Sequence, residues 1–85
     1  MTTAEAKVAV RFNSIVEEKY HKVRGYAFSV TWVNEPEKKP YIRLGVRDLS
    51  ANSIIEAAPE AFEVVDWKAV PQVVEYFIEQ EKKKD

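Results

Sequence analysis

The sequence contains no cysteine, and it has only two glycines, one histidine and one methionine among 85 residues. Without cysteine the chain has neither disulfide bonds nor thiolate ligands for a metal. The two glycines, Gly25 and Gly45, lie too far apart to form a glycine-rich loop that cradles a phosphate group. The lack of cysteine fits a reducing compartment, and we expect a cytoplasmic protein.

Long apolar runs are also absent from the sequence. A membrane-spanning helix needs roughly 18 consecutive apolar residues, and the N-terminal stretch MTTAEAK lacks the apolar core of a signal peptide. We therefore expect no contact with a membrane. Apolar residues make up 46% of the chain and charged residues 32%, which is typical of a globular protein. A chain of this length predicts one compact domain over residues 1–85.

Residues 25–49 carry the strongest secondary-structure pattern. Two stretches that alternate aromatic and β-branched residues flank the turn-forming, charged stretch 34–40 (NEPEKKP), which predicts an antiparallel hairpin. We expect one face to be buried, with these residues: Tyr26, Phe28, Val30, Trp32, Ile42, Leu44 and Val46. We expect the outer face to carry these: Ala27, Ser29, Thr31, Tyr41, Arg43 and Arg47. A register shift of one residue in either strand exchanges its two faces.

A helix is predicted at each end of the chain. Thr2 and Glu5 have the spacing of a capping box, apolar residues recur at helical spacing, and Gly25 follows a basic cluster. This pattern predicts a first helix over about 4–24. Pro71 suits a first helical position and precedes an apolar stripe, which predicts a last helix over about 70–84. Phe12 and Phe77 are expected to join Phe28 and Trp32 in the core.

The stretch between the hairpin and the last helix is open to two interpretations. Ser53 and Glu56 again have capping-box spacing, which indicates a short helix that Pro59 ends, followed by a short third strand near 61–65. The alternative is a single kinked helix over 50–65. The expected fold is α+β: a small antiparallel sheet, built on the 25–49 hairpin, with both helices packed on one face.

Groups suited to catalysis are few. His21 lies among lysines, where a solvent-facing or helix-capping role is expected, and no nucleophile motif accompanies it. We predict no catalytic residue, no cofactor and no metal ligand. Acidic residues do cluster in the sequence after the hairpin, and they carry a third hypothesis, a small enzyme or metal-dependent protein. They are Glu56, Glu60, Glu63 and Asp66.

Groups suited to binding are more plentiful. Basic residues predominate over 19–47 and acidic residues over 48–81, so the two regions either form a charge dipole or neutralise each other in the fold. The predicted partner-binding residues are Arg43, Arg47, Tyr41, Lys38 and Lys39. Because arginine and tyrosine anchor protein interfaces, we expect a non-enzymatic accessory or regulatory module that binds another protein, or a second copy of itself. The alternative is binding of single-stranded nucleic acid by the same residues.

Overall fold

The computed structural model describes residues 1–68 and 71–83, which form a five-stranded antiparallel sheet with a helix near each end of the chain. The elements are α1 (Thr3–Arg11), β1 (Ile15–Glu18), β2 (Arg24–Val33), β3 (Tyr41–Asp48), β4 (Ile54–Ala57), the 3₁₀ turn η1 (Pro59–Ala61), β5 (Phe62–Asp66) and α2 (Pro71–Lys83). The predicted α+β class, the hairpin and the strand near 61–65 are confirmed. The predicted ends of the last helix, residues 70 and 84, lie outside the described residues.

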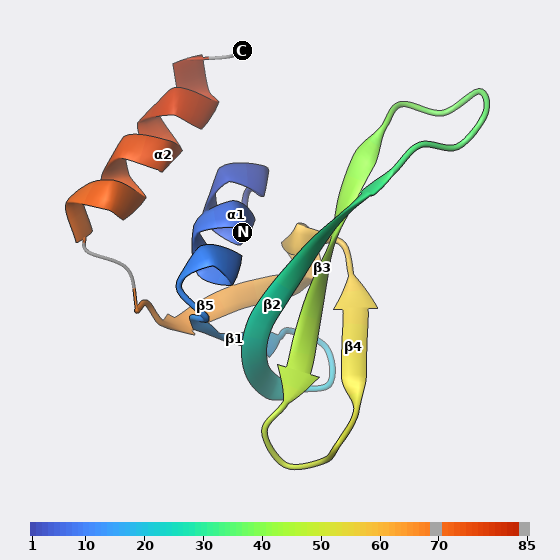
Figure 1. Ribbon diagram of the computed structural model, residues 1–85, viewed down its shortest axis with the longest axis vertical. Coiled ribbons are helices and arrows are strands. Elements are labelled where there is room, and N and C mark those ends of the chain that lie inside the picture. Colours follow the sequence, from blue (N-terminus) through green and yellow to red (C-terminus); the bar gives the residue numbers. More distant parts are fainter. Residues whose placement is uncertain (69–70, 84–85) are drawn as a thin grey trace.

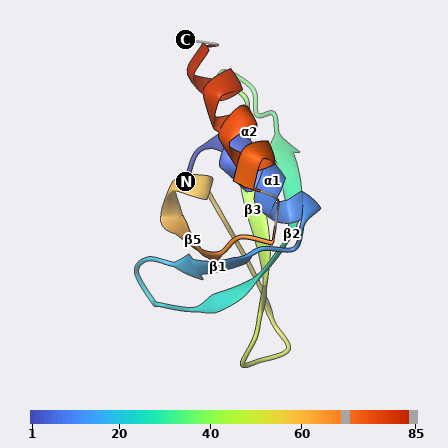
Figure 2. The same ribbon diagram turned by 90° about the vertical axis from the view of Figure 1, so that its left-hand side faces the viewer.

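The sheet is strongly curved. Its strand order is β4-β3-β2-β1-β5. The long strand β2 bends between its partners, so the β1–β5 pair runs across the direction of β3 and β4 (Figures 1 and 2). Helix α1 packs against β2, and α2 packs on α1. The hairpin of β2 and β3 extends well beyond the helices and ends in the loop at the top right of Figure 1.

The core lies on the inner side of this curve. Its buried members are Ala6, Ala9, Val16, Ala27, Ile42, Leu44, Val46 and Phe62. Alanine side chains on α1 let the helix backbone approach the sheet closely, while Phe62 and Leu44 are the largest fully buried side chains. Burying an apolar side chain of that size contributes about 1.5–3 kcal/mol. The core face predicted for β3, with Ile42, Leu44 and Val46, is confirmed.

The predicted first helix is too long. The capping box of Thr2 and Glu5 is confirmed, but α1 ends at Arg11. Asn13 adopts the left-handed conformation (φ 51°), and the N–H groups of Asn13 and Ser14 donate to the carbonyls of Val10 and Ala9. This is the Schellman arrangement, which ends a helix at a glycine or, as here, an asparagine. Residues 15–18 then form β1.

The short helix predicted between Ser53 and Pro59 is wrong, and so is the alternative of one kinked helix over 50–65; only the strand near 61–65 is confirmed. Asp48 accepts hydrogen bonds from the backbone N–H and the hydroxyl of Ser50, which makes a turn after β3. The chain then returns as β4, which pairs with β3. Pro59 begins the short η1 turn. The β-branched pair at the start of β4, Ile54 and Ile55, outweighs the capping-box spacing of Ser53 and Glu56.

A β-bulge in β2 overturns part of the predicted face assignment. Ala27 pairs with Val46 and Ser29 with Gly45, so Phe28 is an extra residue opposite a single step of β3. Before the bulge Ala27 is buried, while Tyr26 is 41% exposed and Phe28 is 40% exposed. After the bulge the predicted faces hold, because Val30 pairs with buried Leu44.

Trp32 is not a core residue, although it faces the same side as Ile42. It is 64% exposed, whereas Ile42, with which it pairs, is 6% exposed. Phe12 is half-buried and packs against Val8. The side chain of Phe77 lies outside the described part of the structure.

Gly25 does not end a helix as predicted. It lies inside β2, and its φ is not positive. A Cβ atom at this position would collide with the carbonyl oxygen of Arg47 and the side chain of Val46. Glycine is therefore required here for space, where β2 crosses closely over β3.

Helix α2 covers the outer side of α1. Trp67 and Ile78 pack around Val8 there. The side chains of Val73 and Val74 on α2 lie outside the described part of the structure. Among the residues that the structure describes, no helix has the length and apolar composition needed to cross a membrane.

The burial pattern is tested by two aromatic truncations. Phe62→Ala is expected to lower the free energy of unfolding by about 3–5 kcal/mol, since a fully buried ring is removed. Trp32→Ala is expected to change it by less than about 1 kcal/mol, because most of this side chain already contacts solvent. Urea denaturation of both variants measures the difference. Equal losses in the two variants would show that the end of the hairpin is buried.

Candidate interaction surface on the outer face of the sheet

The sheet surface opposite the core, here called the outer face, presents a row of side chains across four strands. In this row Tyr26 of β2 pairs with Ile15 of β1 and with Arg47 of β3, and Arg47 pairs with Ile54 of β4. Directly paired residues in antiparallel strands lie on the same face, about 4.5–5.5 Å apart at Cβ. In this row Arg47 therefore lies between Tyr26 and the exposed residue Ile54.

The bulge adds a second aromatic ring to this row. A Cβ atom at Gly45 would meet the ring of Phe28 at 3.3 Å, so that ring lies directly over the glycine backbone. Tyr26, Phe28, Arg47 and Asn13 together line a shallow hollow of about 380 Å³. Asn13, the residue that ends α1, thus also borders this surface.

The charges on the outer face are only partly free. Arg43 lies 3.2 Å from the Oε1 atom of Glu56 through Nε, and its Nη2 atom donates to the backbone carbonyl of Glu56 at 2.6 Å. This ion pair joins the basic and acidic regions of the sequence, so the two regions neutralise each other at this point. Within the described residues, the structure shows no ion pair or hydrogen bond for the side chain of Arg47.

The five predicted binding residues do not form one cluster. Tyr41, Arg43 and Arg47 share the outer face of β3, as predicted. Lys38 and Lys39 lie in the loop at the far end of the hairpin, where Lys38 pairs with Glu35 at 3.1 Å. The Tyr41 hydroxyl donates to Glu35 at 3.4 Å. Because a strand rises about 3.4 Å per residue, the end of β3 at Tyr41 lies about 20 Å from Arg47, and the two lysines lie beyond it.

The sequence interpretation missed Tyr26, Phe28, Ile54 and Asn13 as surface residues. The first two were assigned to the core because regular alternation continues through them, and a bulge leaves no clear trace in that pattern. Ile54 was placed in a helix. A signal for Asn13 was present, since Asn-Ser followed by two β-branched residues is typical of a helix end before a strand.

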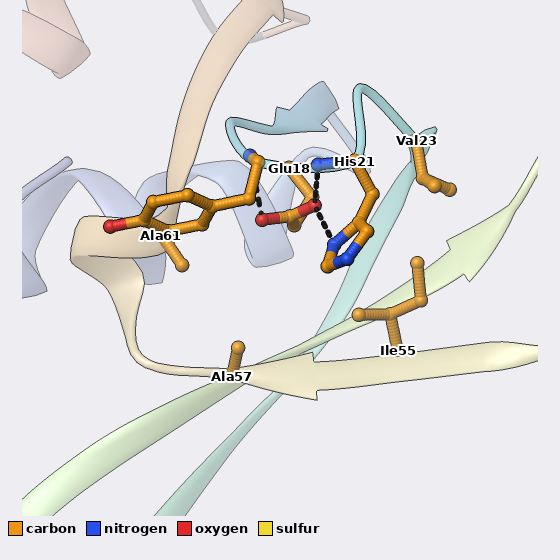
Figure 3. A pocket seen from close by; sticks show the side chains of 7 residues that line it. Glu18, His21, Val23, Ile55, Ala57 and Ala61 are labelled. Carbon is orange, nitrogen blue, oxygen red and sulfur yellow. Dashed lines mark hydrogen bonds and ion pairs between the residues drawn. The ribbon is translucent and has the colours of Figure 1, made fainter.

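A second polar cluster lies at the β1–β2 turn, where Glu18 is buried. The Glu18 carboxylate accepts hydrogen bonds from the N–H of Tyr20 at 2.8 Å, the N–H of His21 at 2.6 Å and His21 Nδ1 at 3.0 Å (Figure 3). Burial raises the pKa of Glu18, but these hydrogen bonds and the nearby imidazole outweigh burial and hold the pKa below its ordinary value. His21 therefore lies in a turn rather than in a helix.

The acidic residues of the third hypothesis are spread over three elements. Glu56 is on β4, Glu60 in η1, and Glu63 and Asp66 on β5. Glu56 is paired with Arg43, and Asp66 with Lys68. In the described ranges, 1–68 and 71–83, no group of three or more histidine, cysteine or acidic residues is placed to hold a metal ion.

Comparison of the chain with protein-family models, with curated proteins and with solved structures gave no match. The fold defines the molecule as a small α+β protein whose curved sheet carries helices on its inner side and exposes its outer face.

The Glu18 cluster predicts a specific acid sensitivity. A carboxylate with a lowered pKa stabilises the fold above its ordinary pKa of 4.5, and that contribution is lost as the pH falls through the lowered value. Glu18→Gln should therefore lower the melting temperature at pH 7. Between pH 5 and about pH 2, the melting temperature of this variant should fall less than that of the unmodified protein. Asp48, whose pKa is lowered by hydrogen bonds from Ser50, should retain part of the acid sensitivity.

Glu60→Gln is the matched control, because Glu60 is exposed on η1. Its melting temperature should follow that of the unmodified protein at every pH. A Glu18→Gln protein with the same pH profile as the unmodified protein would contradict the stabilising role of Glu18.

Proposed function

We propose that this protein is a non-enzymatic interaction module, with an accessory or regulatory role, that binds another protein through the outer face of its sheet. The observation that carries the proposal is the row formed by Ile15, Tyr26, Arg47 and Ile54, with Phe28 beside it. Ile54 is 60% exposed, and both aromatic rings are partly exposed as well. Contiguous exposed apolar side chains on a small protein are typical of interaction sites.

Arg47, for which the described residues show no ion pair, indicates the chemistry of the partner. Arginine and tyrosine are over-represented among the residues that dominate binding energy, and they act best when apolar contacts exclude water around them. A matching partner surface presents a carboxylate flanked by apolar side chains. Arg43 is a weaker anchor than the sequence suggests, because Glu56 already neutralises it.

Nucleic-acid binding is the second candidate function. Two aromatic rings beside an arginine on an open sheet face can stack bases and contact a phosphate. Against it, Glu56 lies on the same face, and Lys38 and Arg43 are paired with carboxylates. A surface with few free cations releases few counterions, so its affinity for phosphate backbones is low. We therefore favour a protein partner.

Charge reversal at Arg47 tests the proposal. Arg47→Glu should leave the circular dichroism spectrum unchanged, because this exposed side chain has no partner within the described residues. Binding to a partner should weaken at least tenfold, as expected for the loss of an interface arginine. Affinity capture with quantitative mass spectrometry identifies the proteins enriched by the unmodified protein and lost with the variant, and calorimetry on the purified pair gives the affinity ratio.

Lys7→Glu is the matched control, since Lys7 is exposed on α1, away from the outer face. It should retain every specific partner. Parallel titrations with single-stranded oligonucleotides at 50 and 200 mM salt test the second candidate, for which affinity should fall steeply with salt. Light scattering of the free protein shows whether the partner is a second copy. Equal capture by the Arg47→Glu and Lys7→Glu proteins would place the interface elsewhere.

A further inference from the structure

A pocket of about 470 Å³ opens between the β1–β2 turn and β4, on the inner side of the sheet (Figure 3). Its apolar lining comes from Val23, Ile55, Ala57 and Ala61. Glu18, Tyr20 and His21 contribute its polar and aromatic lining. Ile55 and Ala57 pair with the buried residues Val46 and Leu44, so the pocket lies on the opposite side of β4 from Ile54 and the outer face.

The hydrogen bonds of Glu18 fix the chemistry of the His21 ring. An ionised carboxylate only accepts hydrogen bonds, so Nδ1 of His21 must donate to the Oε2 atom of Glu18, 3.0 Å away. In the neutral ring the other nitrogen, Nε2, is then an acceptor. Figure 3 shows the His21 ring extending from the turn toward β4, with Glu18 on one side and Ile55 on the other. Nε2 is the ring nitrogen that does not contact Glu18, and the structure shows no hydrogen bond to it within the described residues.

We propose that the pocket binds a small neutral molecule with an apolar body and a hydroxyl group, that is, an aryl or alicyclic alcohol. The apolar body contacts the methyl groups of Ile55, Ala57 and Ala61, and the hydroxyl donates a hydrogen bond to Nε2 of His21. An enclosed cavity of about 150 Å³ already holds a benzene ring. This open pocket, at about 470 Å³, has room for one ring and its substituents.

The buried charge explains why the ligand is neutral. The ionised Glu18 carboxylate repels an anionic ligand. Its oxygens already accept three hydrogen bonds within the turn, and its side chain is only 8% exposed, so it offers a cationic ligand little direct contact. A neutral hydroxyl needs only the acceptor that His21 presents. This site is independent of the proposed function of the outer face, and either can be present without the other.

A matched pair of probes tests the proposal. p-Cresol and toluene have the same ring and methyl group and differ by one hydroxyl. Both are titrated at pH 8, and binding is followed by NMR shifts of the methyl groups of Val23, Ile55, Ala57 and Ala61. p-Cresol should bind about threefold to tenfold more tightly than toluene, the ratio that one net hydrogen bond supplies.

Two variants separate the hydroxyl contact from the apolar contact. His21→Phe keeps a flat ring in an 83%-exposed position but removes the acceptor, so the affinity ratio of the two probes should fall to about one. Ala57→Leu fills the pocket and should weaken both probes at least fivefold. Ile54→Leu, on the other side of β4, should leave both affinities unchanged.

Three results would overturn the proposal. The first is that neither probe shifts the pocket methyl groups. The second is that the p-cresol to toluene ratio is the same in the His21→Phe protein. The third is that Ala57→Leu and Ile54→Leu affect binding equally, which would show that the probes bind outside the pocket. Circular dichroism confirms that each variant is folded before titration.

Discussion

The bulge at Phe28 is the constraint on which both surfaces of the sheet depend. One extra residue in β2 turns Tyr26 and Phe28 outward while Ala27 and Val30 face the core. Bulges also increase local twist and bending. Strand β2 pairs with β1 at its first residues, Arg24 to Tyr26, and with β3 from Gly25 to Val33, and the bend lets it pair with both (Figure 1). A regular strand would bury the two aromatic rings and leave the outer face without its apolar row.

Sequence patterns predict the regular parts of this fold correctly. The hairpin, β5, the inward face of β3 and the capping box of α1 all follow from alternation, turn residues and cap spacing. The errors lie where short-range hydrogen bonds decide the structure. Asn13 ends α1 by adopting a left-handed conformation, and the Glu18 carboxylate holds the turn that follows β1. These contacts leave the hydrophobic period unchanged, so a long helix and a short helix with a strand look alike.

The candidate surface was predictable only in part, for an electrostatic reason. Composition identifies Arg43 and Arg47 on one face of β3, but it does not show which of them is neutralised. Register decides this, because Glu56 of β4 lies diagonally across from Arg43 and reaches it, while Arg47 faces Ile54. The location of β4 depends in turn on recognising a strand in residues that carry a helix-capping pattern. One missed strand therefore changes the charge assigned to the whole face.

The strand order also brings together two segments that lie far apart in the sequence. β1–β2, β2–β3 and β3–β4 are neighbours in sequence, whereas β1 and β5 pair only after the chain from Glu18 to Phe62 has folded back. Closing a loop of that length costs more conformational entropy than closing the loop of any of the three other pairings. The hydrogen bond from the N–H of Lys19 to the carbonyl of Ala61 lies at the end of the β1–β5 pair, next to the turn that Glu18 stabilises. The same turn thus anchors the last strand of the sheet and forms one wall of its inner pocket.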